Sequence, residues 1–235
     1  RLPISLWSEK AFLEQSVSSD SGLGLQYGIL LAMILYNLFL YFTIRESSYL
    51  FYVVTIASQA TFLFLDSKHL RYLLDELYMG SWWVNMSERI IYPLMVVTAL
   101  LFQRSLIRVW EYNPKLDKAI EIMLGGIGLV ILLTFVPNEK TFQYLFITLV
   151  IAAIPLAFYS NIDAIRRENL TAAVHMAAMG VFLAGTIILM TLQLWPAFPN
   201  NAFTKNAYNA GLIIESLLLP LSLKTQYNQI KQINR

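Results

Sequence analysis

The sequence predicts an all-α fold, a polytopic membrane bundle of seven helices. Seven stretches are long, apolar and nearly free of charge, and basic residues collect in every second gap between them. Only 14% of the 235 residues are charged, against about 25% in a soluble domain. A helix crosses the hydrocarbon core with about 20 apolar residues and satisfies its own backbone groups there. We therefore expect each stretch to span the bilayer as a helix.

The seven spans are separated by gaps that carry the charged and turn-forming residues. In chain order, we expect the spans at residues 22–42, 49–65, 90–106, 119–136, 141–160, 171–194 and 205–223. One set of gaps holds Arg45, then Arg104 with Arg108, Lys115 and Lys118, then Arg166 with Arg167, then Lys224 with Lys231 and Arg235. The other short gaps hold only Lys140 and Lys205. Basic residues in short loops mark the cytoplasmic side, so we predict the N-terminus outside and the C-terminus in the cytoplasm.

The two ends predict connections to other domains. The chain starts at Arg1 without Met or a signal peptide, so we expect a fragment of a longer protein. We interpret residues 1–21 as an external linker that follows a missing β-domain, and residues 22–223 as the bundle. Residues 224–235 continue a helical apolar stripe of Leu223, Tyr227, Ile230 and Ile233. This pattern indicates either an amphipathic tail on the membrane or the start of a cytoplasmic signalling helix with coiled-coil character.

Four motifs occur in a characteristic order along these spans. Residues 27–31 read YGILL and 35–40 read LYNLFL; residues 45–52 read RESSYLFY; residues 113–117 read NPKLD; and residues 211–223 read GLIIESLLLPLSL. In these motifs and their order the chain resembles the bacterial seven-transmembrane receptors with diverse intracellular signalling modules, the 7TMR-DISM family. The resemblance covers residues 21–230, and Pro220 departs from the family pattern. It implies an external carbohydrate-binding-like β-sandwich before the bundle and a histidine kinase or diguanylate cyclase type of output domain after it.

Glu215 is the first candidate site residue. It lies about ten residues into the last span, roughly 15 Å deep. An ionisable side chain at that depth is costly unless it is paired or neutral, and burial favours the protonated acid. Gln59 lies at a similar depth in the second span, so we predict a Glu215–Gln59 hydrogen bond, with Asn37 in a lower polar layer. The pair is either a structural fastening or a ligand-binding or switch site.

Two prolines and a pair of tryptophans complete the candidates. Pro220 and Pro155 lie inside spans, where they deprive the Ser216 and Ile151 carbonyls of their helical donors. We expect either static kinks or, at Pro220, a hinge in the helix that feeds the output domain. Trp82 and Trp83 fit the aromatic belt at the outer interface. The gap at 66–89, with an apolar helical face at Leu70, Leu73, Leu74 and Leu77, indicates an interfacial helix or a lid that contacts a ligand.

A stripe of small residues indicates helix packing, and the scarcity of metal-ligating and phosphate-binding residues limits the chemistry that this region can carry out. Ala173, Ala177, Gly180 and Ala184 form a helical stripe that predicts close helix packing, or else a dimer seam. The chain contains no cysteine, two histidines and no phosphate-binding loop, and the basic residues Lys205 and Lys224 lie at opposite ends of the last span, with none between them. We therefore expect no metal site, no cofactor and no catalytic residues in this region.

These observations favour a sensor or receptor module that relays an extracytoplasmic or intramembrane signal through the seventh helix to a missing cytoplasmic output domain. We expect a multi-pass protein of the bacterial inner membrane and a homodimer. Membrane lipids and an unknown small molecule are the expected partners, without nucleic acid, because the inner basic residues most simply meet anionic head groups. The alternative is a small transporter or channel, which would need polar residues along a path through the bundle. An intramembrane enzyme lacks a catalytic constellation.

Overall fold

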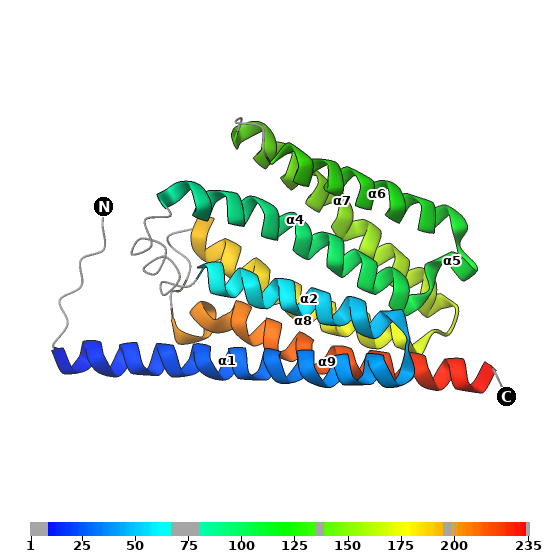
Figure 1. Ribbon diagram of the computed structural model, residues 1–235, viewed down its shortest axis with the longest axis horizontal. Helices are drawn as coiled ribbons and strands as arrows, with labels where there is room; N and C mark the ends of the chain where they lie inside the picture. The colour runs from blue at the N-terminus through cyan, green and yellow to red at the C-terminus, as the bar shows by residue number, and fades with distance from the viewer. Residues whose placement is uncertain (1–8, 67–79, 135–138, 195–198, 200, 234–235) are drawn as a thin grey trace.

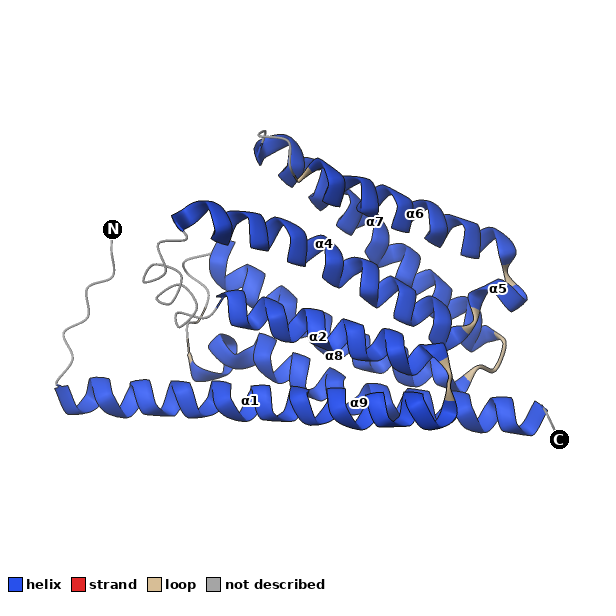
Figure 2. Ribbon diagram, in the orientation of Figure 1, coloured by secondary structure: helices blue, strands red, loops and turns tan. Residues whose placement is uncertain are grey.

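The computed structural model describes residues 9–66, 80–134, 139–194, 199 and 201–233. Its helices, numbered as in Figure 1, are α1 (Glu9–Ile44), α2 (Ser47–Asp66), α4 (Gly80–Ile107), α5 (Val109–Tyr112), α6 (Pro114–Leu133), α7 (Glu139–Arg166), α8 (Leu170–Leu194) and α9 (Ala202–Ile233). The described residues form helices and short connections and contain no strand (Figure 2). The all-α prediction is therefore confirmed, with seven long helices and the four-residue α5 in the described chain.

The long helices form one elongated bundle. The start of α1 lies at one end of the bundle, and α5 and the C-terminus lie at the other (Figure 1). The turns after α1 and α7 lie at this second end as well, so the basic gaps predicted to be cytoplasmic share one end with the tail of α9 (Figures 1 and 2). This arrangement fits an odd number of crossings.

Five helices of the described chain contain a stretch long and apolar enough to cross a membrane. These stretches are Ser21–Ile44, Ser47–Leu65, Arg89–Ile107, Thr141–Arg166 and Leu170–Leu189. α6 and α9 are not among them: α6 carries Asp117, Lys118 and Glu121 near its start, and α9 carries several polar residues besides Glu215. With α6 and α9, the seven long helices match the predicted order.

Helix boundaries differ from the predicted ones mainly at the end of the bundle that we predict to be external. α1 begins at Glu9, so residues 16–21, interpreted as part of a linker, lie inside a helix. α4 begins at Gly80, ten residues before the predicted span, and includes Trp82 and Trp83. The first eight residues of the predicted linker and the predicted interfacial helix at residues 70–77 lie outside the described residues.

The end of the bundle that holds the C-terminus, which we predict to be cytoplasmic, is called the inner end. Its turns are short and locally defined (Figure 1). Arg45, Arg108 and Glu168 have φ values of 61°, 53° and 63°, so each of these turns places a non-glycine residue in the left-handed region. α6 begins with a different device: the Asn113 side chain accepts a hydrogen bond from the Leu116 amide at 3.2 Å, and Pro114 takes the first helical position. The NPKLD motif is therefore a helix start.

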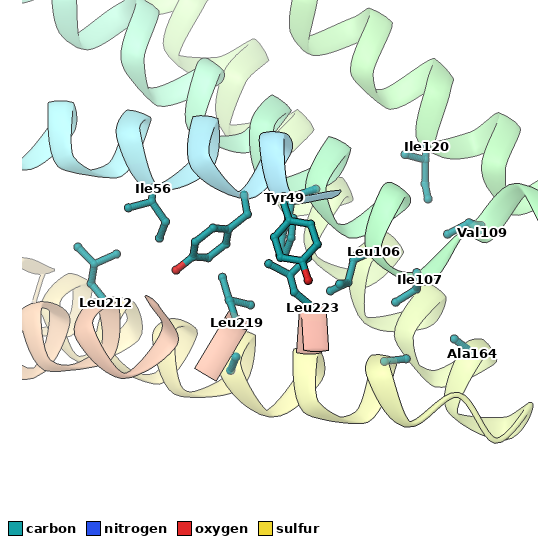
Figure 3. Packing of buried hydrophobic residues seen from close by; sticks show 14 of the residues in the cluster. Tyr49, Ile56, Leu106, Ile107, Val109, Ile120, Ala164, Leu212, Leu219 and Leu223 are labelled. Atoms are coloured by element: carbon teal, nitrogen blue, oxygen red, sulfur yellow. The ribbon is translucent and has the colours of Figure 1, made fainter. Parts of the chain in front are cut away.

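The main apolar core lies where α2 and α4 pack on α9. Tyr52, Ile56, Phe102, Leu212 and Leu219 are at most 2% exposed. Figure 3 shows Ile56 of α2 above Leu212 and Leu219 of α9, with Leu223 continuing the row toward the inner end. By contrast, α1 exposes the large apolar side chains Leu25, Leu31, Leu35, Phe39 and Phe42. α1 therefore forms an edge of the bundle toward lipid.

α8 and α9 pack closely through glycines that the predicted stripe did not include. A Cβ built on Gly185 would lie 2.5 Å from the Ala207 carbonyl oxygen, and one on Gly211 would lie 3.1 Å from the Val181 carbonyl oxygen. Within the predicted stripe, Ala177 and Ala184 are exposed, and a Cβ on Gly180 would meet nothing within 4 Å. The close packing that the stripe predicted therefore occurs on another face of α8, because small residues alone do not tell a protein-facing side from a lipid-facing one.

Candidate functional site

Glu215 and Gln59 form a buried polar pair between α9 and α2. The Gln59 Nε2 donates a hydrogen bond to the Glu215 Oε2 at 3.1 Å. The two residues are 8% and 4% exposed. The predicted partnership is therefore confirmed as a contact, and it places the acid inside the bundle rather than toward lipid.

The amide oxygen of Gln59 has no hydrogen-bond donor in this pair. Gln59 Oε1 is buried and makes no hydrogen bond to any described residue. An unpaired amide oxygen inside a protein costs about 1–3 kcal/mol. Such a group in a native site calls for an explanation, and a donor that binds there would supply one.

Asn37 lies apart from this pair. It is fully buried on α1, and its Nδ2 donates to the Met33 carbonyl oxygen of its own helix at 2.8 Å. Its Oδ1 has no hydrogen-bond partner among the described residues. Asn37 does not line the cavity that contains Glu215, so the structure separates it from the other two candidates.

Pro220 produces a second contact between α9 and α2. Because proline has no amide hydrogen, the carbonyl of Ser216, four residues earlier, lacks its helical donor. The Tyr52 hydroxyl donates to this carbonyl oxygen at 2.7 Å. Tyr52 is fully buried, and its ring packs on Phe102 with centroids 5.7 Å apart. A side chain of α2 therefore replaces the backbone bond that Pro220 removes.

Two further prolines lie inside helices. Pro155 lies inside α7, as predicted. Ile151, one turn earlier in the same helix, is 65% exposed, so this part of α7 borders lipid. Pro93 interrupts α4 and is buried, although the sequence analysis did not single it out. Pro220 is the proline that lies beside the Glu215–Gln59 pair.

Gln226 fastens the inner end of α9. Its Nε2 donates to the Ser48 hydroxyl at 3.0 Å and to the Ser105 carbonyl oxygen at 3.1 Å, and the two serine hydroxyls are 2.9 Å apart. Beside it, Thr171 of α8 donates to Thr225 at 3.2 Å. We call Ser48, Ser105, Thr171, Thr225 and Gln226 the exit clasp. The clasp joins α9 to α2, α4 and α8 just beyond the predicted end of the last span.

A cavity of about 260 Å³ lies beside Glu215, between α2, α4, α7, α8 and α9. Its polar lining side chains are Thr55, Gln59, Gln103, His175, Thr186 and Glu215, and its apolar ones are Met95, Val96, Ala99, Leu100, Phe102, Val150, Ala153, Ile154, Ala157, Met179, Phe182, Leu183 and Leu219. Glu215 and Gln59 thus share a mostly apolar cavity. The side chains of Trp82 and Trp83 lie outside the described residues.

A polar network that the sequence analysis missed lines another part of the cavity. Gln103 Nε2 donates to the Ala157 carbonyl oxygen at 2.8 Å and also contacts the Ser160 hydroxyl. Asn161 Nδ2 donates to the same carbonyl at 2.9 Å, and Asn161 Oδ1 lies 3.0 Å from His175 Nδ1. Because this oxygen can only accept, His175 carries its hydrogen on Nδ1. The available signal was a glutamine and a histidine in otherwise apolar spans.

Charged residues gather at the inner end, at the ends of the predicted spans and in the gaps between them. Arg104 Nη2 donates to Asp117 at 2.8 Å and to Glu121 at 2.7 Å, and Asn113 Nδ2 donates to Asp163 at 2.9 Å. These contacts join the start of α6 to α4 and α7. They give the Asp117 of the NPKLD motif a structural role.

Tyr112 lies in this inner cluster and has a perturbed phenol. Burial, with a smaller contribution from the nearby Asp163 carboxylate, raises the pKa of Tyr112 to about 12, and Arg167 opposes both effects. The Arg167 guanidinium lies over the Tyr112 ring, 5.1 Å from its centroid.

Among the described residues, no three of His, Cys, Asp and Glu lie close enough together to hold a metal ion.

Comparison with known proteins adds the family. The sequence model of the 7TM diverse intracellular signalling family matches residues 20–225. Neither the curated proteins nor the solved structures contained a match to the chain. The family match covers all the residues that line the cavity and every residue of the exit clasp except Gln226.

Proposed function

The chain belongs to the family of 7TM diverse intracellular signalling proteins, and from that premise we propose that α9 relays a signal from the bundle to a cytoplasmic output domain. A member of this family is a multi-pass membrane protein with a transmembrane sensor domain linked to signalling. The family fixes this general role. The relay helix and the path of the signal are our proposal.

The attachment of α9 to α2 is the observation that carries the proposal. α2 holds α9 at Glu215 through Gln59, at Ser216 through Tyr52, and at Gln226 through Ser48. The first two contacts precede Pro220 and the third follows it, while α9 continues as a helix to Ile233. A change at the cavity therefore acts on the same helix that leaves the bundle at the inner end.

The relay requires two arrangements of α9 that differ in free energy by a few kcal/mol. A ligand shifts the balance only by the difference between its affinities for the two arrangements. Glu215 and Gln59 line the cavity and join α9 to α2, so a ligand that contacts them favours one arrangement of these helices. Pro220 lies between this contact and the exit clasp, and it weakens the helix where a bend must occur.

The finer assignments follow from the sequence and the family. We propose an external N-terminus, a cytoplasmic C-terminus and an output domain of the histidine kinase or diguanylate cyclase type. The bundle would act as a homodimer in the bacterial inner membrane, among anionic lipids, and contain no enzyme activity itself. The external linker before the bundle would then be helical from Glu9 onward. A transporter or channel is the alternative, and the largely apolar lining of the cavity favours the sensor over it.

A reversible lock on the exit clasp tests the relay. Residues 1–235 contain no cysteine, so Thr171→Cys with Thr225→Cys introduces one thiol pair into this region, where the two hydroxyl oxygens lie 3.2 Å apart. We expect the oxidised pair in the full-length protein to fix the output activity at one level, and reduction to restore its response. Each single cysteine variant, under the same oxidation, is the matched control.

The outcome that contradicts the relay is equally direct. Complete crosslinking, verified by mass spectrometry, with an output that responds as in the single variants would show that α9 does not move at the clasp. Solute flux through liposomes that contain the purified bundle, with no effect of the crosslink on output, would favour the transporter instead.

A further inference from the structure

The cavity beside Glu215 has one polar end that its own side chains leave incomplete. Thr55 and Thr186 donate to carbonyls of their own helices at 2.8 and 3.0 Å. Gln103 and His175 bond within the network with α7. Gln59 Oε1 is a fully buried acceptor at this cavity that has no hydrogen bond among the described residues. The end of the cavity at Gln59 and Glu215 therefore accepts a donor.

The charges of the lining narrow the chemistry of that donor. No Lys or Arg is among the lining residues, so an anionic head group such as a carboxylate or phosphate would have no cation to pair with. An ammonium would need an ionised Glu215, and moving both charges into this apolar site costs free energy that one contact does not recover. A neutral hydroxyl needs neither charge.

A hydroxyl also matches the geometry of the pair. Gln59 Nε2 already occupies Glu215 Oε2 at 3.1 Å. A bound hydroxyl can donate its hydrogen to Gln59 Oε1 and accept one from the acid group of Glu215. This closes a ring of hydrogen bonds in which each polar atom of the pair is used.

The remainder of the cavity sets the size and the character of the ligand. Most lining side chains are apolar, from Met95 and Leu100 to Phe182 and Leu219. A dry cavity of about 150 Å³ holds benzene, so the 260 Å³ here fits on the order of ten non-hydrogen atoms. We propose that this cavity binds a medium-chain aliphatic alcohol, with its hydroxyl between Gln59 and Glu215 and its chain among the apolar side chains.

The role of the alcohol as a signal rests on the proposed relay, whereas its binding to the cavity does not depend on that proposal. An aliphatic alcohol partitions into the bilayer and can reach the bundle from there. Contact with Glu215 of α9 and Gln59 of α2 makes its occupancy a bias on the helix pair that the relay uses.

Photolabelling of the purified chain in lipid nanodiscs tests the binding step. The probe is an aliphatic alcohol the size of octanol that carries a diazirine in its chain. We expect labelled residues to map to the cavity, with Met95 and Met179 as the informative positions, and 1-octanol to compete. Octane, octanoate and octylammonium should not compete, since they lack a neutral donor.

Three variants sharpen the test. Gln59→Leu removes the free acceptor and should lower labelling about fivefold, the worth of one hydrogen bond. Asn37→Leu is the matched control, a buried amide with an unpaired oxygen outside the cavity, and should leave labelling unchanged. Ala99→Leu reduces the cavity volume without removing a polar group and should also lower labelling.

The outcomes separate the two proposals. Labelling that is spread along lipid-facing positions, or competition by octane equal to that by octanol, would overturn the alcohol site. Competition by octylammonium stronger than by octanol would replace the neutral ligand with a cationic one. Cavity labelling by the alcohol with no change in the output of the full-length protein would leave the binding site intact and refute its role as the signal, while the crosslink at the exit clasp tests the relay itself.

Discussion

Replacing Tyr52 by Phe removes one hydroxyl and keeps the ring that packs on Phe102. The lost bond is the 2.7 Å contact to the Ser216 carbonyl oxygen, which Pro220 has deprived of its backbone donor. A buried acceptor without a partner costs about 1–3 kcal/mol in proteins, while side-chain hydrogen bonds in membranes average only about 0.6 kcal/mol. Because this carbonyl has no helical alternative, we expect a loss of about 1.5 kcal/mol.

The same substitution should cost less once Pro220 is replaced. Pro220→Ala restores an amide that can donate to the Ser216 carbonyl, so the carbonyl keeps a partner when Tyr52 becomes Phe. We expect a loss of about 0.5 kcal/mol in that background, close to an ordinary interhelical bond in a membrane. The difference, a coupling of about 1 kcal/mol between positions 52 and 220, is about a fivefold change in the unfolding equilibrium.

A double-mutant cycle measures this coupling. The free energy of unfolding of the four proteins would be measured by reversible unfolding, in bicelles to which a denaturing detergent is added. Tyr49→Phe is the control, because Tyr49 is a buried tyrosine on the same helix whose hydroxyl makes no hydrogen bond to α9 among the described residues. Equal losses for Tyr52→Phe with and without Pro220 would refute the reasoning that the tyrosine replaces the missing helical donor.

Three further predictions concern other parts of the bundle. Gly185→Ala should destabilise the bundle by about 1–3 kcal/mol, because its Cβ would lie 2.5 Å from a backbone oxygen of α9. Gly180→Ala, on the same helix with open space around it, should be neutral or stabilising in the same unfolding assay. Gln226→Leu should increase hydrogen exchange of the α9 residues after Pro220 without affecting the rest of the bundle, and unchanged exchange would exclude a fastening role for the clasp. Tyr112 stabilises the fold in its neutral form, with a pKa of about 12 in the folded protein against 10.0 in a free phenol. Its contribution should therefore be lost as the pH rises from 10 to 12. Tyr112→Phe should reduce that loss, as followed by phenolate absorbance and helicity.

The sequence could predict features that depend on depth and order along a span. Glu215 and Gln59 both lie near the middle of apolar stretches, and simple rise per residue placed them at one level. The hydrogen bond between them confirms that estimate. Pro220 likewise identified the orphan carbonyl of Ser216, because that effect follows from the covalent structure of proline.

Features that depend on lateral neighbours were not predictable in the same way. Tyr52 reads as a packing residue, and nothing in the sequence indicates that its hydroxyl reaches α9. The same applies to the network from Gln103 to His175, which needs the positions of α4, α7 and α8 around the cavity. Packing within the bundle was wrongly predicted for Ala177 and Ala184 for a related reason, since lipid and protein are both apolar surroundings in a membrane. The alternative, a dimer seam, stays a prediction.

Helix boundaries were least predictable where the chain leaves the apolar core. Residues 16–21 contain serines, an aspartate and weak helix formers, so they read as a linker. α1 nevertheless includes them, because helical hydrogen bonds continue past the membrane surface once the span has nucleated the helix. At the other end, the apolar stripe after Leu223 correctly indicated that α9 continues.

Because α9 is one continuous helix, its rotation about its own axis sets the direction that the residues after it face. α9 is a single helix of 32 residues from Ala202 to Ile233, and each residue of an α-helix adds about 1.5 Å of rise and about 100° of rotation. One residue inserted after the exit clasp would therefore turn whatever follows by more than a quarter of a circle, whereas an insertion of seven residues would nearly restore its facing. The number of residues after the bundle therefore sets the rotational orientation of whatever follows as well as its distance from the bundle.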